Sequence, residues 1–227
     1  MSGRNSDPRD GVVAACLAVA RLGLSHGTSG NVSLRRDTKS FFISPSGMGY
    51  DILAGKDIPW VDFDGIWHGP FRPSSEWRFH RDIYRARADA GAIVHTHSRH
   101  ATALACAGRG IPAFHYMVAV AGGPDIRCAP YATFGSQELS NHAVVALADR
   151  KACLLANHGV IAIGPNLDAA LSLAGEVENL AAQYVAALQV GPPHILDEAE
   201  MKRVLAQFAT YGRQDAGDPD LKKGSDA

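Results

Sequence analysis

The sequence predicts an α/β fold: a single domain over residues 1–227, in which a central mixed or antiparallel β-sheet is flanked by helices. The chain has 227 residues, which is enough for one domain with a substantial core but few for two. Hydrophobic residues make up 46% and charged residues 20%, as in ordinary globular proteins. Helical and strand patterns are interleaved without strict alternation, which favours a mixed or antiparallel sheet over a parallel one.

The individual elements follow from turn residues and hydrophobic periodicity. Asp7 and Pro8 are typical of a helix start, an N-cap acceptor before a proline; apolar residues then recur at helical spacing until the segment 27–30 ends the helix. The other expected elements are strands at 31–35, 40–44, 92–97, 152–156 and 160–163, and helices at 77–87, 136–149, 166–190 and 198–209. The polar ends, about 1–10 and 215–227, are expected to be flexible.

Charge and hydrophobicity argue against two classes of partner. The net charge is -1, from 22 basic and 23 acidic side chains, so no nucleic-acid surface is expected. No stretch reaches the roughly 18 apolar residues that a membrane span needs, and residues 1–10 are too polar for a signal peptide. The cysteines are Cys16, Cys106, Cys128 and Cys153. They lie far apart and form no CxxC pair, so we expect reduced thiols of a cytoplasmic protein, without a metal role.

The segment His95-Thr96-His97 is the strongest local indication of a metal site. Alternate residues of a strand point to the same side, so both imidazoles project from one face. A third histidine, His158, lies in an Asn-His-Gly turn after an apolar strand, and loops at strand ends often build sites. Three histidines without cysteine are typical of an open catalytic zinc site. The alternative is histidines at strand ends and turns that bind nothing.

Three small loops are rich in hydroxyl groups and glycine. They are Gly-Thr-Ser-Gly-Asn at 27–31, Ser-Pro-Ser-Gly at 44–47 and Pro-Ser-Ser-Glu at 73–76. Backbone N–H groups at glycines and at a helix start can bind a phosphate, and Glu76 could be a metal ligand or a general base. Taken singly, each loop is also compatible with an ordinary turn, or at 73–76 with a serine-capped helix start. None contains lysine or arginine, so a phosphate there would be held by neutral donors and by the metal.

Eight short segments match, in order, the motifs of one protein family. They are GTSGNVS (27–33), SPSG (44–47), PSSEWRFH (73–80), VHTH (94–97), IPAFHYM (111–117), CAPYATFG (128–135), NHGVIA (157–162) and TYG (210–212). The chain thereby resembles the class II aldolase/adducin family over about residues 12–212, and most closely its L-fuculose-1-phosphate aldolases. The resemblance implies that family's three-layer α/β fold.

The resemblance also implies a set of site residues. Zinc, one ion per subunit, would be held by His95, His97 and His158, with Glu76 as the fourth ligand until substrate displaces it. The implied phosphate-binding residues are Thr28, Asn31, Ser46, Gly47, Ser74 and Ser75; serine stands at 46 where the family often has threonine. The implied residues at the aldehyde end of the pocket are Phe134, Phe208 and Tyr211.

Family members are homotetramers with sites between subunits, and this affects two tyrosines. The resemblance implies that Tyr116, and with it Tyr211, reaches the site of a neighbouring chain. Taken alone, each would more simply be a packed tyrosine with its hydroxyl hydrogen-bonded.

The implied reaction is cleavage of a ketose 1-phosphate into dihydroxyacetone phosphate and a short aldehyde. Breaking C3–C4 leaves negative charge at C3, which zinc at the C2 oxygen would stabilise as a Lewis acid. Glu76 would move the proton at C3, and Tyr116 that of the C4 oxygen. A Schiff-base mechanism would need a lysine in apolar surroundings, and the lysines of this chain lie in polar segments.

Several alternatives stay open. A pentulose-phosphate 4-epimerase shares the fold and the zinc site but carries an acidic residue near the position of Tyr116; a decarboxylase of phosphorylated oxo-acids is another relative. An adducin-like binding module is disfavoured because Glu76 and all three histidines are present. The sugar is also open among L-fuculose, 5-deoxyribulose and 5-methylthioribulose 1-phosphates, since an apolar aldehyde would suit Phe134 and Phe208. The last two substrates would indicate salvage of nucleoside by-products.

Overall fold

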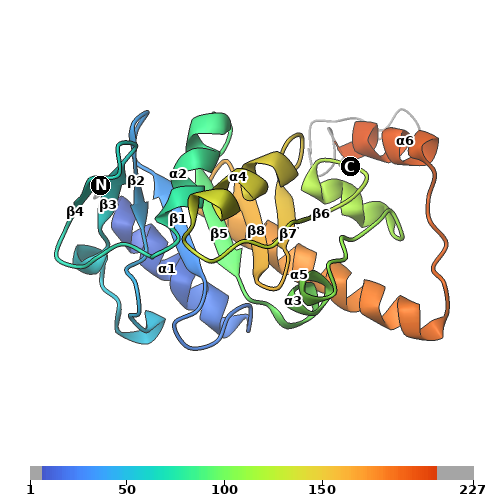
Figure 1. The fold of residues 1–227 in the computed structure, drawn as a ribbon, viewed down its shortest axis with the longest axis horizontal. Helices are drawn as coiled ribbons and strands as arrows, with labels where there is room; N and C mark the ends of the chain where they lie inside the picture. The colour runs from blue at the N-terminus through green and yellow to red at the C-terminus, as the bar shows by residue number, and fades with distance from the viewer. Residues whose placement is uncertain (1–6, 209–227) are drawn as a thin grey trace, which may run out of the picture.

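The computed structural model describes residues 7–208, and these form one sheet with helices on both faces (Figure 1). The strands are β1 (Asn31–Arg35), β2 (Ser40–Ile43), β3 (Trp60–Asp62), β4 (Trp67–His68), β5 (Ala92–Thr96), β6 (Arg127–Ala129), β7 (Ala152–Leu155) and β8 (Gly159–Gly164). The α-helices are α1 (Pro8–Arg21), α2 (Trp77–Ala86), α3 (Arg99–Cys106), α4 (Gln137–Ala146), α5 (Leu167–Val190) and α6 (Glu198–Phe208). Short 3-10 helices are η1 (Tyr50–Ile52), η2 (Gly55–Asp57) and η3 (Tyr116–Ala121).

The sheet is mixed, as the sequence predicts. Over the described residues its eight strands run in the order β4-β3-β2-β1-β5-β8-β7-β6. Neighbouring strands are antiparallel except for the parallel pair β6 and β7 at one edge. The central strand β5 lies between β1 and β8, with Asn31 opposite His95 and His95 opposite Ile161. The histidine strand therefore lies in the middle of the sheet.

Two hydrophobic cores, one on each face of the sheet, give the expected three layers. Adjacent residues of β5 show the division, because side chains alternate between faces along a strand. Val94 packs with the core under α1, α3 and α5, whereas Ile93 packs with the core under α2 and α4. His95 lies on the same face as Ile93, so its side chain faces α2. There the edge of its ring meets Phe79, with ring centroids 5.3 Å apart.

Several predicted boundaries differ from the observed ones. The strands expected at 40–44, 92–97 and 152–156 each end one residue earlier, and the helix expected at 136–149 ends at Ala146. The chain then turns through Asp149, whose φ of 57° lies outside the helical region. The first helix starts at Pro8, with Asp7 as its cap accepting from Arg9 N, which confirms the helix start predicted at Asp7 and Pro8. The flexible end expected at about 1–10 therefore reaches too far into the chain. The rest of both expected flexible ends, and Tyr211, lie outside the described residues.

Among the described strands and α-helices, four have no counterpart among the predictions: α3, β3, β4 and β6. Each is short, with at most eight residues, and periodicity is weak over so few positions. The four cysteines, all within the described residues, are unpaired. Cys16 and Cys153 are buried as expected of small hydrophobes, but Cys106 is exposed.

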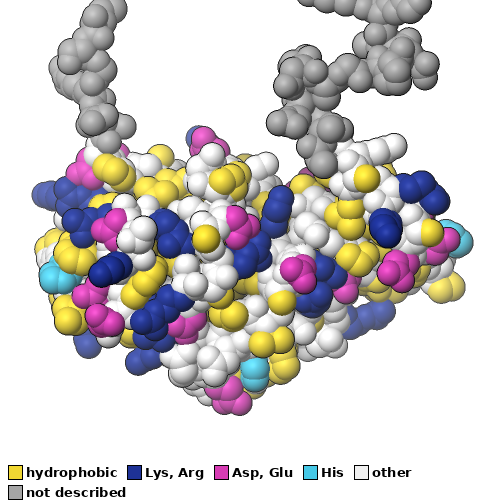
Figure 2. Space-filling model, turned by 90° about the horizontal axis from the view of Figure 1, so that it is seen from above, with side chains coloured by type: hydrophobic (Ala, Val, Ile, Leu, Met, Phe, Trp, Pro, Cys, Tyr) yellow, Lys and Arg dark blue, Asp and Glu magenta, His cyan; other side chains and the backbone are white. Residues whose placement is uncertain are grey.

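The surface carries both signs of charge. Figure 2 shows basic and acidic side chains interspersed over the face seen from above, in keeping with the net charge of -1. Among the described residues, no helix has both the length and the apolar character needed to cross a membrane.

Candidate active site

The three hydroxyl-rich loops meet at one pocket with a volume of about 310 Å³. Its lining residues are Thr28, Ser29, Gly30, Asn31, Pro45, Ser46, Gly47, Ser74, Ser75, Glu76, His97, Tyr131, Ala132, Phe134, Asn157 and His158. All six residues predicted to bind phosphate are therefore brought together. None of the residues that line this pocket in the described chain is lysine or arginine, so an anion there would meet neutral donors, as the sequence predicts.

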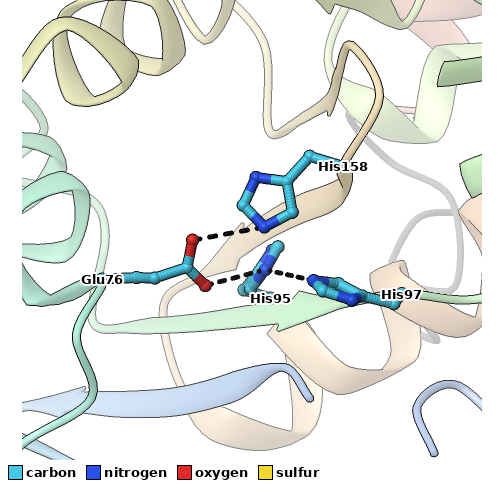
Figure 3. A group of neighbouring side chains, drawn as sticks. All are labelled: Glu76, His95, His97 and His158. Atoms are coloured by element: carbon cyan, nitrogen blue, oxygen red, sulfur yellow. Dashed lines mark hydrogen bonds and ion pairs between the residues drawn. The ribbon is translucent and has the colours of Figure 1, made fainter. Parts of the chain in front are cut away.

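Glu76, His95, His97 and His158 form a compact cluster at this pocket (Figure 3). One ligand atom of each lies within 4.8 Å of the others, so the four could hold a metal ion. His95 Nε2 is 3.0 Å from His97 Nε2 and 3.2 Å from Glu76 Oε2. His158 Nε2 is 3.2 Å from Glu76 Oε1. The predicted pairing of the two histidines of β5 with the turn histidine is thus observed in the structure.

Backbone features of the turn between β7 and β8 place His158 beside the histidines of β5. His158 lies between β7 and β8 in a turn where Asn157 has a φ of 54°, a left-handed conformation that asparagine tolerates better than most residues. The next residue, Gly159, packs so closely that a Cβ there would lie 2.4 Å from the Thr96 carbonyl oxygen and 2.8 Å from His97 Cδ2. Glycine is therefore required where β8 passes the histidine strand.

Glu76 immediately precedes α2, yet it does not cap the helix. Its side chain makes no capping hydrogen bond to the helix start. Instead its Oε2 accepts from Asn31 Nδ2 at 3.0 Å, while its backbone N–H donates to Ser74 Oγ at 3.2 Å. Of the two interpretations left open by the sequence, a plain helix N-terminus and a site carboxylate, the structure favours the second.

The protonation states suit a cation ligand set. Burial, with the neighbouring imidazoles adding to it, lowers the pKa values of His97 and His158 to about 4. Burial alone would raise the pKa of Glu76, but its interactions with His95, His158 and Asn31 lower that pKa to about 2. At neutral pH the Glu76 carboxylate thus lies in a cluster in which the rings of His97 and His158 are unprotonated.

Two further observations support the fit of a metal ion. Glu76 Oε1 is buried and makes no hydrogen bond to any described residue; a buried carboxylate oxygen of this kind is normally satisfied by a donor or a cation. His95 Nδ1 lies 2.9 Å from the carbonyl oxygen of Val160, so Nδ1 carries the hydrogen and Nε2 presents its lone pair to the cluster.

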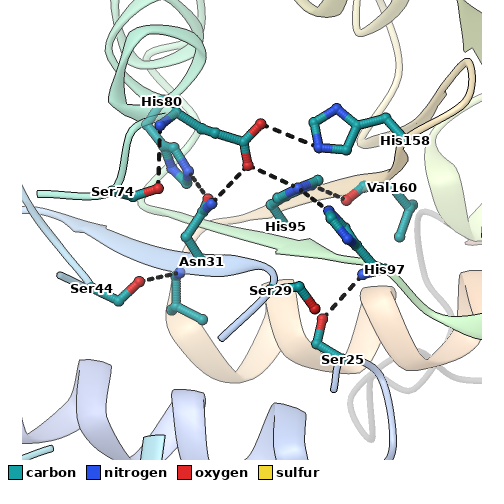
Figure 4. A network of polar contacts seen from close by, with 12 residues as sticks. Ser25, Ser29, Asn31, Ser44, Ser74, His80, His95, His97, His158 and Val160 are labelled. Carbon is teal, nitrogen blue, oxygen red and sulfur yellow. Dashed lines mark hydrogen bonds and ion pairs between the residues drawn. The ribbon is translucent and has the colours of Figure 1, made fainter. Parts of the chain in front are cut away.

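Sequence reasoning missed several residues around the cluster (Figure 4). Ser25 Oγ accepts from His97 N at 3.0 Å. The fully buried His80 lies beside Asn31, with His80 Nε2 2.5 Å from Asn31 Oδ1. Tyr131 and Asn157 line the pocket. His80 stood within the quoted motif at 73–80, four residues after Glu76 and hence on the same side of a helix, which was the available signal.

Of the aromatic residues predicted for the aldehyde end, Phe134 lines the pocket of its own chain and Phe208 does not. Phe134 lines the pocket and is 66% exposed, so it is free to meet a ligand. Tyr116 and Phe208 do not line the pocket of their own chain. They lie together where η3 meets α6, with ring centroids 6.5 Å apart, and Tyr116 is half exposed. Tyr211 lies outside the described residues.

Comparison with known proteins agrees with the fold. Residues 10–185 match the family model described as the class II aldolase and adducin N-terminal domain. The chain therefore belongs to the class II aldolase/adducin family. A Rhodospirillum rubrum protein named 5-methylthioribulose-1-phosphate/5-deoxyribulose-1-phosphate aldolase is 54% identical over 212 residues, which cover 93% of this chain and 96% of that protein.

Two further similar proteins are named as aldolases of a different sugar phosphate, that of L-fuculose. The protein of Escherichia coli K12 named L-fuculose phosphate aldolase is 48% identical over 202 residues, 88% of this chain and 94% of its own. A solved structure named L-fuculose 1-phosphate aldolase superposes with a TM-score of 0.87 at 38% identity, covering 91% of this chain and 98% of that one.

Proposed function

We propose that this protein is a zinc-dependent aldolase that cleaves a ketose 1-phosphate into dihydroxyacetone phosphate and a short aldehyde. The observation that carries the proposal is the cluster of Glu76 with three histidines, situated in a pocket lined by three hydroxyl-rich loops. The names of its relatives support the same reaction class, because those proteins are described as aldolases of sugar phosphates.

The phosphate half of the substrate would bind on the loops. Thr28, Ser46, Ser74 and Ser75 offer hydroxyl donors, and Gly47, with a φ of 70°, offers a backbone N–H that no side chain obstructs. Asn31 lines the same pocket, but its amide is already hydrogen-bonded to Glu76 and His80. Its contribution to phosphate binding would come from the second hydrogen of Nδ2.

The chemistry at C3 and C4 would be divided between two side chains. A zinc ion held by the cluster would act as a Lewis acid toward the substrate carbonyl. The Glu76 carboxylate moves the proton at C3, since it is the base of the pocket and is unprotonated at neutral pH. The proton of the C4 oxygen is exchanged by a tyrosine hydroxyl, which we assign to Tyr116 of a neighbouring subunit.

The assignment of Tyr116 requires a homotetramer with sites between subunits. Tyr116 is exposed and lies outside the pocket of its own chain, so only a second subunit can bring its hydroxyl to that pocket. Phe208, which lies next to Tyr116, would reach the same neighbouring site. Tyr211, three residues beyond Phe208 in the sequence, is proposed to act with them.

The aldehyde half would be recognised by apolar contacts. Phe134 and Tyr131 are exposed at the pocket, and such rings suit an aldehyde that ends in a methyl or methylthio group better than a hydroxylated one. We therefore propose 5-methylthioribulose 1-phosphate and 5-deoxyribulose 1-phosphate as substrates, which would place the protein in a cytoplasmic salvage pathway for nucleoside by-products. L-fuculose 1-phosphate, whose aldehyde also ends in a methyl group, is the third candidate.

A substrate panel tests the proposal. The purified protein, loaded with zinc, is given each of the three ketose 1-phosphates, and release of dihydroxyacetone phosphate is measured. We expect turnover of all three and the highest kcat/KM for one of the two 5-substituted pentuloses. Absence of release from every member of the panel would refute the reaction class. A preference for L-fuculose 1-phosphate would refute the assigned substrate only.

A further inference from the structure

A chain of buried hydrogen bonds leads from Glu76 into the core between β1 and α2. Figure 4 shows its first part, around Asn31 and His80. Asn31 Nδ2 is 3.0 Å from Glu76 Oε2, and Asn31 Oδ1 is 2.5 Å from His80 Nε2. On its other side, His80 Nδ1 is 2.7 Å from Ser33 Oγ, which in turn is 2.8 Å from the Tyr84 hydroxyl. None of these five side chains is exposed, and His80 and Ser33 are fully buried.

The spacing of the residues explains why the chain forms. Asn31 and Ser33 are two apart on β1, so they point to the same face of the sheet. Glu76, His80 and Tyr84 are four apart along the start and body of α2, so they lie above one another on the side that covers this face. One strand face and one helix face thus meet along a row of polar groups.

The donor of each hydrogen bond in this row can be assigned. A carboxylate accepts hydrogen bonds only, so the Asn31 amide must present its NH₂ group to Glu76 and its oxygen to His80. His80 must then carry its hydrogen on Nε2. Burial, with His95 nearby, lowers the pKa of His80 to about 3, so the ring is neutral and Nδ1 accepts from the Ser33 hydroxyl. Ser33 Oγ accepts in turn from Tyr84.

We infer that His80 is a positioning residue for the proposed aldolase reaction: its Nε2–H fixes the orientation of the Asn31 amide, and through that amide it holds the carboxylate of Glu76. This inference rests on the proposed function for its effect on rate. His80 does not line the pocket, and its ring nitrogens contact Asn31 and Ser33 rather than a residue of the cluster, so it acts through Asn31.

The reversed Asn31 amide shows what His80 prevents. In that orientation Asn31 Oδ1 would face Glu76 Oε2, two acceptors without a hydrogen between them, and the NH₂ group would face the N–H of His80. Both contacts are unfavourable, so His80 disfavours the reversed state. Without the Nε2–H donor, the amide can rotate, and Glu76 then loses the hydrogen bond that its carboxylate accepts from Asn31.

A packing role for His80 is the alternative, because its ring stacks on Phe79 with centroids 4.6 Å apart. Two variants separate the roles. His80→Gln keeps an N–H that can donate to Asn31 Oδ1, whereas His80→Leu fills a similar volume without a donor. We expect His80→Leu to lower kcat roughly 10- to 100-fold, the usual effect of losing a hydrogen bond to a charged group, and His80→Gln to lower it much less.

A double-mutant cycle with Asn31→Ala tests whether the effect passes through Asn31. In the Asn31→Ala protein there is no amide to orient, so His80→Leu should cause no further loss of kcat. An equal loss of kcat in both backgrounds, or a His80→Gln variant as slow as His80→Leu, would overturn the inference. Zinc content and the urea midpoint are measured for every variant, so that loss of metal or of folding is not mistaken for loss of rate.

The tautomer of His80 gives a readout that needs no substrate. In protein labelled with ¹⁵N at histidine, two-bond ¹H–¹⁵N correlations distinguish Nε2–H from Nδ1–H. We expect the neutral Nε2–H form for His80 in the unaltered protein. Observation of the Nδ1–H form would overturn the inference even if no ketose phosphate were turned over, and even if His80→Leu failed to fold.

Discussion

His95 donates its Nδ1 hydrogen to the carbonyl oxygen of Val160 on the adjacent strand β8, at a distance of 2.9 Å. The bond joins β5, which carries His95, to β8, which begins directly after His158. It determines which nitrogen of His95 faces the cluster. A backbone carbonyl cannot be lost by mutation of a side chain, so the tautomer of the central ligand is fixed by the fold itself. The cluster is therefore prepared for a cation before one binds.

Metal removal should abolish activity, and a zinc salt should restore it. The three imidazoles and Glu76 are the proposed ligand set, so His95→Ala and His97→Ala should each lower zinc content as well as turnover. Metal content by mass spectrometry and dihydroxyacetone phosphate release are measured on the same preparations. His142→Ala, at a partly buried histidine on α4 that does not line the pocket, serves as the control and should keep both. Full activity in protein shown to be free of metal would contradict the proposed mechanism.

Glu76→Gln should separate metal binding from proton transfer. Three histidines remain in the variant, so it should still bind zinc and fold, but an amide cannot accept the C3 proton. Exchange of the C3 proton of dihydroxyacetone phosphate with deuterated solvent should fall about 10²- to 10⁴-fold. Glu198→Gln, on the exposed side of α6, is the control variant. Near-normal exchange in Glu76→Gln would mean that another group moves this proton.

Local sequence patterns predicted most of the helices and strands and singled out the three histidines of the cluster, while the resemblance to the family joined Glu76 to them as one ligand set. The alternation of His95 and His97 on a strand, and the position of His158 after an apolar strand, follow directly from strand geometry. The order of the strands in the sheet cannot be derived in this way, because it depends on which strands pair. The register that places Asn31 opposite His95 is therefore known only from the structure.

The contacts that the sequence could not predict are long-range hydrogen bonds and contacts between subunits. Asn31 and His80 are 49 residues apart in the chain, and no local pattern specifies that they meet. The predicted role of Tyr116 depends on a second subunit, so the single chain leaves it a prediction. In both cases the information lies in tertiary or quaternary packing rather than in spacing.

Stability should depend on pH through Glu178, which caps α3 from α5. Glu178 accepts from the backbone N–H groups of His100 and Ala101 at 2.9 Å each. Burial would raise the pKa of Glu178, but the hydrogen bonds from these two backbone groups and from the side chains of Ser98 and His100 together outweigh burial and lower it. Because the folded-state pKa is the lower one, the stabilisation is present at neutral pH and is lost as pH falls through that pKa.

Glu178→Gln should therefore lower the free energy of unfolding at pH 7 by about 1–3 kcal/mol, as for a hydrogen bond to a charged group. Near pH 3.5, below the ordinary pKa of glutamate, the difference between variant and unaltered protein should shrink. Urea unfolding at both pH values measures this, with Glu176→Gln on the same helix as the control. A difference that is equal at the two pH values would show that the charge of Glu178 does not stabilise the cap.

Tyr116→Phe should slow cleavage of the C3–C4 bond without slowing proton exchange at C3. The hydroxyl is assigned to the C4 oxygen, so its loss should slow cleavage of the C3–C4 bond by about 10²- to 10⁴-fold. Exchange of the C3 proton of dihydroxyacetone phosphate should be spared, since it needs only the metal cluster and Glu76. Both are measured on one preparation, by product release and by deuterium incorporation. If exchange falls as far as cleavage, Tyr116 does not act at the C4 oxygen.

Mixing two inactive variants tests whether each site is shared between subunits. Tyr116 lies outside the pocket of its own chain, where the described residues place His95 and Glu76. A Tyr116→Phe subunit keeps its metal cluster, and a His95→Ala neighbour can supply the missing hydroxyl. After unfolding and joint refolding at equal amounts, on the order of a quarter of the sites in a cyclic tetramer should combine both intact parts.

Subunit mixing is verified with a mass tag on one variant. Recovery of activity in the mixture, but in neither variant refolded alone, is the expected result; no recovery despite verified mixing would mean that each site is built from a single chain.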